Sequence, residues 1–136
     1  MIAVLDTSIA TKWFAPDGDE GDAVAERVLR EVVAHPRRFV VPELFFYEMT
    51  AVLCRRMHQA RDAYAALSRL ARLGLRRVRL DDRLLRRATQ LVYDHKVGGY
   101  DACFAALAMD LGGVWLTLDR AAHGRLAALG ISRIPA

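Results

Sequence analysis

Four acidic residues occupy positions where the surrounding sequence is otherwise apolar. Asp6 and Asp119 each follow a short apolar run. Glu48 and Asp101 lie in helical patterns in which the neighbours on the same face are mostly apolar or small. An ionised carboxylate on an apolar face is costly unless another group compensates its charge. No partner close in sequence is evident for Glu48, so we single out these four residues as candidates for chemistry.

The chemistry that suits such a set is metal-assisted. Carboxylates that share a dry pocket repel one another and resist ionisation, and a divalent cation relieves that repulsion. A set of oxygen ligands favours Mg²⁺ or Mn²⁺ over zinc. Such a cation suits phosphoryl chemistry because it polarises the phosphate and activates a water. The chain offers no evident nucleophile of its own, and its four histidines are dispersed.

Each carboxylate also has a purely structural interpretation. Asp6 and Asp119 could each cap the helix that follows a strand. Glu48 and Asp101 could each belong to an ion pair with an arginine from elsewhere in the chain. His123 follows Asp119 by four residues, and a local helical pair between the two is favoured over a role for His123 in the site. The metal site is favoured because all four acids fit it together.

Strands and helices alternate along the chain, and the strands are short apolar runs. This pattern is typical of an α/β protein with a parallel sheet covered by helices on both faces. Ligands of such sheets bind beyond the carboxyl ends of the strands, where the strand order switches. The expected strands are 2–5, 39–41, 76–80, 114–117 and a short edge strand at 131–134, and the expected helices are 7–14, 20–34, 43–58, 61–73, 82–96, 100–111 and 119–129.

Length and composition exclude several classes of protein. The 136 residues suit one domain spanning 1–136, and 54% hydrophobic with 26% charged residues excludes disorder. Two cysteines, Cys54 and Cys103, exclude a disulfide scaffold and a Cys-based zinc site. No apolar run is long enough for a membrane span, and no signal peptide is evident. We therefore expect a cytoplasmic protein without a membrane partner.

Four short motifs, in order, resemble a known family. They are Asp6-Thr7-Ser8, Pro42 followed by Glu48, Tyr100-Asp101-Ala102 and Thr117-Leu118-Asp119. Together they resemble the PIN domain, and most closely the VapC-type toxins of toxin–antitoxin pairs. The resemblance implies a three-layer α/β/α fold with a central, mostly parallel sheet of four to five strands. It also implies an endoribonuclease dependent on Mg²⁺ or Mn²⁺, a homodimer, and a cognate antitoxin of the VapB type.

The same resemblance assigns roles to individual residues. Its acidic metal-site and catalytic residues correspond to Asp6, Glu48, Asp101 and Asp119, and its supporting hydroxyls to Thr7, Ser8 and Thr117. Two departures stand out. Ala51 occupies a position where many relatives carry asparagine, and no further acid follows Asp119 within the next few residues. These departures favour one metal ion over two.

Two other segments have an open interpretation. Between residues 55 and 87 there are eleven arginines against three aspartates, which could contact an RNA backbone, an acidic antitoxin segment or only solvent. The helical segment 44–53 is apolar almost all round, with Phe46, Met49, Leu53 and Met57 on the side away from Glu48. Such a helix belongs to a core or an interface, and we expect part of it to meet a second subunit or an antitoxin helix.

Competing functions make different demands on the sequence. A phosphatase of the haloacid-dehalogenase kind requires a second aspartate where Ser8 stands. A receiver module requires an acidic pair after its first strand and a lysine after its last, and neither is present. The acidic loop 17–22 lacks the glycine and glutamate that a calcium-binding loop requires, and suits the start of a helix instead. A PIN-like RNA-binding module or a housekeeping nuclease remains the alternative to a toxin.

Overall fold

The structure, a computed structural model, describes residues 1–136 and contains one five-stranded sheet. All neighbouring strands are parallel, in the order β3-β2-β1-β4-β5. In the central register, Val4 pairs with Val40 on one side and Trp115 on the other. The strands are β1 (Ala3–Leu5), β2 (Phe39–Pro42), β3 (Arg76–Val78), β4 (Val114–Leu116) and β5 (Ser132–Arg133). The predicted parallel sheet is confirmed, with five strands.

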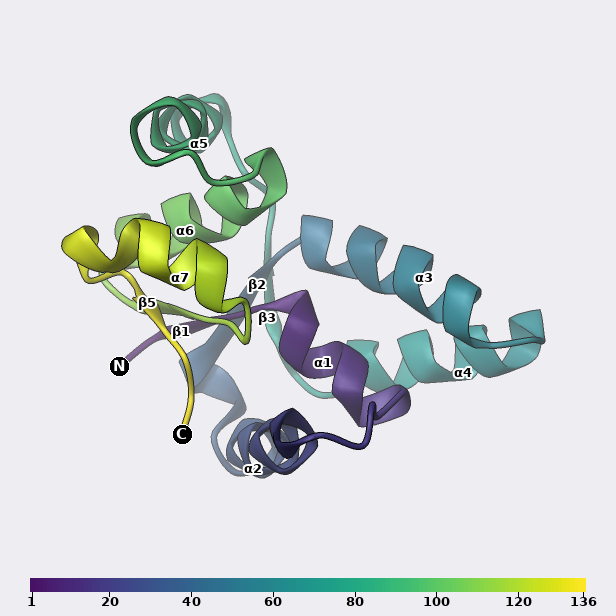
Figure 1. Ribbon diagram of the computed structural model, residues 1–136. Helices are drawn as coiled ribbons and strands as arrows, with labels where there is room; N and C mark the ends of the chain where they lie inside the picture. Colours follow the sequence, from purple (N-terminus) through teal and green to yellow (C-terminus); the bar gives the residue numbers. More distant parts are fainter.

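Seven α-helices connect the strands and cover both faces of the sheet (Figure 1). Parallel strands are joined by right-handed crossovers, so the direction of each step decides which face a helix covers. From β1 the chain adds β2 and then β3 toward one edge of the sheet. It then crosses back to add β4 and β5 toward the other edge. Helices α1–α4 and α5–α7 therefore lie on opposite sides, as Figure 1 shows. The helices are α1 (Thr7–Phe14), α2 (Glu20–Ala34), α3 (Leu44–Arg56), α4 (Ala60–Ala71), α5 (Asp82–His95), α6 (Gly99–Leu111) and α7 (Arg120–Leu126).

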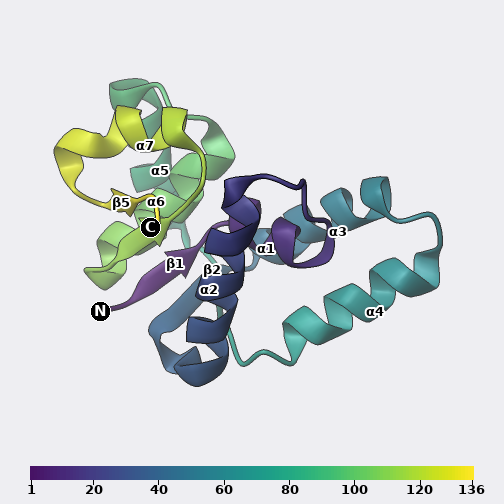
Figure 2. The same cartoon turned by 60° about the horizontal axis from the view of Figure 1, so that its bottom comes forward.

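The switch in strand order lies between β1 and β4. From β1 the chain continues to β2 on one side, and it later returns to β4 on the other. The carboxyl ends of these two strands therefore border a crevice that no crossover helix closes. Helices α3 and α4 form a hairpin that extends away from the sheet, as Figure 2 shows from another direction.

Element boundaries differ from the sequence expectations mainly where few contacts fix them. Strand β3 ends at Val78 instead of residue 80, and β5 has only two residues. Both are edge strands, which pair on one side only. Asp6 caps α1, as its structural interpretation predicted. Two short 3-10 helices, Pro36–Arg38 and Ala127–Leu129, follow α2 and α7.

The core is a single apolar cluster that both layers of helices share with the sheet. Trp115 of β4 is fully buried and packs against Phe104 of α6, with ring centroids 6.1 Å apart. Helix α6 buries four alanines, Ala102, Ala105, Ala106 and Ala108. Small side chains let this helix lie close to β1, β2 and β4, and this closeness sets the position of its first turn.

The apolar residues on the side of α3 away from Glu48 contribute mainly to this core. Phe46 is 7% exposed, and Met49 and Leu53 are fully buried, whereas Met57 is only partly buried. Helices α1 and α4 pack against α3, and the Arg77 guanidinium lies over the ring of Phe46. These apolar residues therefore fit the core interpretation of the helix, and the exposed side of α3 carries Tyr47. The expectation that part of α3 meets a second subunit or an antitoxin helix stays a prediction. No helix combines the length and hydropathy that crossing a bilayer requires.

Candidate active site

Asp6 lies at the carboxyl end of β1, directly at the switch in strand order. Its side chain is the N-cap of α1, and the Ser8 amide donates to Oδ2 over 3.3 Å. The residue is only 7% exposed. Asp6 therefore does cap helix α1, as its structural interpretation requires. The cap uses only Oδ2, one of the two carboxylate oxygens.

Three further donors hold the Asp6 carboxylate. The hydroxyls of Ser8 and Thr117 donate to Oδ2 over 2.6 and 2.9 Å, and the Trp115 indole donates to Oδ1 over 3.3 Å. Burial nevertheless raises the pKa of Asp6, with the hydrogen bonds from Ser8, Thr117 and Trp115 opposing the shift. Oδ2 accepts several hydrogen bonds and Oδ1 only one, so Oδ1 retains the capacity to bind a further ligand.

The same two hydroxyls tie Asp6 to the loop after β4. The Leu118 amide donates to Ser8 Oγ, and the Asp119 amide donates to Thr117 Oγ1, each over 3.0 Å. Each hydroxyl thus accepts from the loop and donates to Asp6. Asp119 itself is exposed and caps α7 by accepting from the Ala122 amide over 3.0 Å. The loop places Asp119 at the same edge of the sheet as Asp6.

Glu48 reaches the crevice from α3 and is partly buried. The Thr7 hydroxyl donates to its Oε1 over 2.9 Å, which joins the first turn of α1 to α3. Burial raises the pKa of Glu48, and the negative charges of Asp6 and Asp101 raise it further, whereas the Thr7 hydrogen bond lowers it. The structure therefore gives Glu48 a hydroxyl partner rather than an arginine.

Asp101 projects from the first turn of α6, on the other side of the sheet. No hydrogen bond to its carboxylate offsets the cost of burial. Burial, followed by the charges of Asp6 and Asp119, raises the pKa of Asp101 to about 6. A helix N-terminus favours an ionised acid, so the raised pKa shows that burial and repulsion outweigh that effect.

The structure thus brings all the predicted site residues to one edge of the sheet. The charge of Asp6 raises the pKa values of Glu48 and Asp101, and the charge of Asp119 also raises the pKa of Asp101. The acids therefore lie close enough to repel one another. As the side chains stand, no three of them form a group close enough to hold one metal ion. The supporting residues Thr7, Ser8 and Thr117 each contact one of the acids directly.

The chemistry of this donor set fits a hard divalent cation. The ligating atoms on offer are carboxylate oxygens, which Mg²⁺ and Mn²⁺ prefer. Three of the acids have raised pKa values because they are desolvated and, for Glu48 and Asp101, because they repel neighbours. A cation among them would counter both effects. The residues therefore fit such an ion in their chemistry, although their present rotamers do not complete a ligand set.

Two contacts of the site region were not foreseen from the sequence. Trp115 was expected only as part of a buried strand, yet its indole N–H donates to Asp6. The sequence offered one indication of this contact, because the indole N–H of a buried tryptophan requires an acceptor. His123 Nδ1 lies 2.7 Å from Ser132 Oγ, so it pairs with β5 and not with Asp119.

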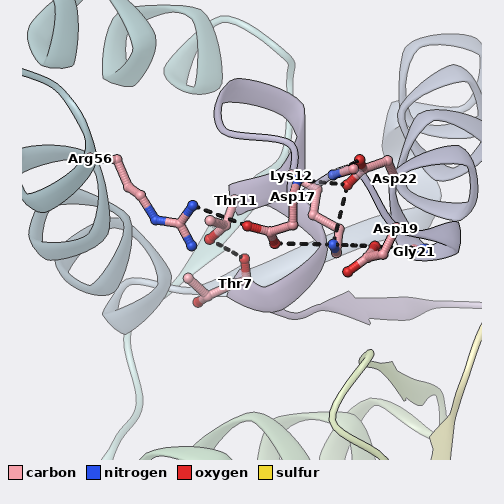
Figure 3. A network of polar contacts seen from close by, with 9 residues as sticks. Thr7, Thr11, Lys12, Asp17, Asp19, Gly21, Asp22 and Arg56 are labelled. Atoms are coloured by element: carbon pink, nitrogen blue, oxygen red, sulfur yellow. Dashed lines mark hydrogen bonds and ion pairs between the residues drawn. The ribbon is translucent and has the colours of Figure 1, made fainter.

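A second polar network fixes the loop between α1 and α2 (Figure 3). Lys12 Nζ lies 2.8 Å from Asp19, 3.1 Å from Asp17 and 3.2 Å from Asp22. Arg56, at the end of α3, also contacts Asp17 over 3.1 Å. The three aspartates of the acidic loop are therefore paired with the chain's own cations. It joins α1, which carries Thr7 and Ser8, to α3, which carries Glu48.

The arginine-rich segment 55–87 is mostly unpaired. Arg56, Arg77 and Arg83 contact Asp17, Glu43 and Asp110, respectively. The remaining eight arginines of the segment make no ion pair within the chain, and they are distributed over α3, α4, β3, α5 and the residues just after α4 and β3. The segment is thus not one continuous stripe, and each part has its own surroundings.

Comparisons with known proteins agree with this geometry. A family model described as the PIN domain matches residues 3–129. VapC20 of Mycobacterium tuberculosis, titled a sarcin-ricin loop cleaving toxin, is 20% identical with a TM-score of 0.76, over 98% of this chain and 99% of that one. A toxin–antitoxin complex from Klebsiella pneumoniae is 17% identical with a TM-score of 0.73, over 98% of both chains.

A third solved structure has the same fold. FitAcB from Neisseria gonorrhoeae is 16% identical with a TM-score of 0.72, over 96% of this chain and 95% of that one. A search of curated proteins finds no match to the sequence. The family model covers nearly the whole chain, with the acidic crevice inside the matched range, and the chain belongs to the PIN domain family.

Proposed function

We propose that this PIN domain is an endoribonuclease dependent on Mg²⁺ or Mn²⁺ and the toxin of a toxin–antitoxin pair. The observation that carries the proposal is the group of buried and half-buried carboxylates at the switch point, with raised pKa values in Asp6, Glu48 and Asp101. Such desolvated acids are typical of functional sites. The titles of the similar solved structures support the toxin part, since they include an RNA-cleaving toxin and a toxin–antitoxin complex.

The residues that would hold the cation are Asp6, Glu48, Asp101 and Asp119. When bound, Mg²⁺ or Mn²⁺ would polarise the phosphodiester and lower the pKa of an attacking water. The hydrogen bonds of Ser8 and Thr117 hold Oδ2 of Asp6 and leave Oδ1 with only the Trp115 indole. Asp6 is thereby oriented before any ligand arrives, which reduces the reorganisation that binding requires.

The remaining acids have different degrees of restraint. Thr7 orients one oxygen of Glu48, and Ala122 anchors one oxygen of Asp119. Asp101 is free of such bonds and can adjust to a ligand. Because its pKa is raised to about 6, Asp101 is mostly ionised at neutral pH and can bind a cation there. A housekeeping nuclease is the less favoured alternative, because two of the similar structures are titled a toxin and a toxin–antitoxin complex.

The partners of the chain are also part of the proposal. We expect a cognate antitoxin of the VapB type and a homodimer, as the resemblance to VapC toxins implies. The antitoxin would be a separate protein, as in the toxin–antitoxin complex from Klebsiella pneumoniae. Induction of the chain alone should arrest growth, and co-expression of an antitoxin gene from the same operon should restore it.

RNA cleavage by the purified chain tests the enzymatic part. We expect cleavage of total RNA with Mg²⁺ or Mn²⁺ and none with EDTA. Asp101→Asn should reduce the rate at least a hundredfold, whereas Asp110→Asn, on the same helix but paired with Arg83, should cleave normally. Equal cleavage by the Asp101→Asn variant and the natural chain would contradict the proposal.

A further inference from the structure

A groove of about 520 Å³ lies beside the acidic crevice, at the carboxyl ends of β2 and β3. It is bounded by the first turns of α3 and α6, the residues after β3 and the start of α5. Its volume lies in the range of small-ligand sites. The lining residues are Glu43, Leu44, Tyr47, Arg79, Leu80, Leu85, Tyr100 and Cys103. We call it the tyrosine groove.

The tyrosine groove and the acidic crevice share two walls. On α3, Tyr47 immediately precedes Glu48, and on α6, Tyr100 immediately precedes Asp101. The strand order places the end of β1, with Asp6, next to β2 and then β3 along the same edge of the sheet. A chain lying along this edge would therefore pass from the acids directly into the groove.

The groove exposes aromatic and apolar side chains to an unusual degree for this molecule. Tyr47 and Tyr100 are each 66% exposed, and Leu85 is 45% exposed. These three are among only eight large hydrophobic side chains that the whole chain exposes. Phenol rings that project into a groove offer faces on which planar groups stack, and stacking on aromatic rings is how proteins hold unpaired bases.

The charge of the groove suits a polyanion. Arg79 is exposed and contacts no carboxylate within the chain. Glu43, the one acid of the lining, is already paired with Arg77, which lies 3.7 Å above the ring of Phe46. The guanidinium of Arg79 is thus the uncompensated charge at this end of the groove. A phosphate next to a stacked base would meet it there.

We propose that the tyrosine groove binds an unpaired base of a single-stranded RNA next to the bond that is cleaved, with Tyr47 and Tyr100 stacking on the base and Arg79 contacting its phosphate. The inference rests on the proposed ribonuclease function and adds the residues that select an unstacked, single-stranded substrate. Base-paired RNA, whose bases are stacked on one another, cannot fill the groove.

Binding of a fluorescent RNA tests the groove separately from cleavage. In the Asp101→Asn background, the probe is a ten-nucleotide single strand carrying 2-aminopurine, placed at each position in turn and titrated in EDTA. We expect one position to lose fluorescence on binding because its base stacks. Tyr100→Ala and Tyr47→Ala should each weaken binding about tenfold and abolish that loss of fluorescence. Tyr100→Phe should retain both, since the ring remains.

Two matched controls sharpen the result. Tyr64 is 74% exposed on α4, outside the groove, so Tyr64→Ala should bind RNA normally. Arg79→Gln should reduce the slope of log affinity against log salt by about 0.7, the value for one phosphate contact on a single strand. Arg72→Gln, at the exposed end of α4, should leave the slope unchanged.

The outcomes distinguish the two proposals. If the natural chain cleaves RNA but both tyrosine variants keep the full affinity and fluorescence change, the groove assignment is wrong and the ribonuclease stands. If these variants instead change the sedimentation mass of the protein and leave RNA binding intact, the groove is a protein interface, which also overturns the inference. If the natural chain cleaves no RNA with either metal, the ribonuclease proposal itself fails.

Discussion

Thr117 Oγ1 donates to Asp6 Oδ2 over 2.9 Å while it accepts the amide of Asp119 over 3.0 Å. One fully buried hydroxyl thus joins the carboxyl ends of β1 and β4, the two strands at the switch point. Because Thr117 Oγ1 binds both the Asp6 carboxylate and the Asp119 backbone amide, the fold itself fixes the relative position of these two residues. This relationship explains why a threonine follows β4.

Removal of this hydroxyl should therefore affect stability and activity together. Thr117→Val leaves the buried Asp6 with one donor fewer and the Asp119 amide without its acceptor. We expect about 1–3 kcal/mol lower free energy of unfolding in urea and slower RNA cleavage. Thr117→Ser retains the hydroxyl and should lose less of both. A Thr117→Val variant as stable and active as the natural chain would show that the hydrogen bond is unimportant.

The raised pKa of Asp101 predicts a pH-dependent stability. A carboxyl whose pKa rises from 3.8 to about 6 on folding destabilises the folded state when ionised. The penalty is complete above pH ~6 and vanishes as the pH falls below ~4, where the carboxyl is protonated in both states. At pH 7.5 we expect Asp101→Asn to be about 1–2 kcal/mol more stable, a figure reduced for partial exposure.

Asp110 provides the matched control on the same helix. The hydrogen bond and charge of Arg83 lower the pKa of Asp110, whereas the pKa of Asp101 is raised. Asp110→Asn should therefore not gain stability at pH 7.5, and its small loss should disappear as the pH falls through the acidic range. Urea unfolding of the three proteins between pH 3.5 and 8 makes the comparison. A constant difference between Asp101→Asn and the natural chain at every pH would contradict the pKa shift.

The Lys12 network in Figure 3 predicts a salt-sensitive contribution to stability. Lys12 contacts three aspartates, and their hydrogen bonds raise its pKa. Lys12→Met leaves those aspartates to repel one another, so the Tm should fall by several degrees at low salt. The deficit should shrink in 1 M NaCl, where the natural network is screened.

The second lysine of the chain is the natural control for this experiment. Lys96 Nζ donates to the Tyr93 carbonyl and contacts no carboxylate. Lys96→Met should therefore change the Tm little and show no added salt dependence. If Lys12→Met also leaves the Tm and its salt dependence unchanged, the ion pairs of Lys12 do not stabilise the protein.

Much of this site was predictable because its residues carry local signals. Asp6 and Asp119 follow apolar strands, and Glu48 and Asp101 interrupt apolar helix faces, so each stands out within a few residues of sequence. Their convergence follows from the parallel topology, which the alternation of strands and helices predicts. The order and spacing of the four motifs are also sufficient to indicate the family.

The contacts that the sequence did not reveal depend on which elements pack together. The bond from Trp115 to Asp6 links residues far apart in the chain, and only the pairing of β1 with β4 brings them together. Helix α3 is apolar almost all round, so its pattern could not tell that Met49 and Leu53 are buried while Tyr47 is exposed.

The central claim is that the acids at the switch point hold a divalent cation, and direct titration with Mn²⁺ tests it. Electron paramagnetic resonance at pH 7.5, without RNA, counts the ions that each chain removes from solution. We predict about one bound Mn²⁺ per chain, displaced by Mg²⁺, and strongly weakened binding in Asp6→Asn and Asp101→Asn but not in Asp110→Asn. Binding that is absent from the natural chain, or equally strong in all four proteins, would contradict the account.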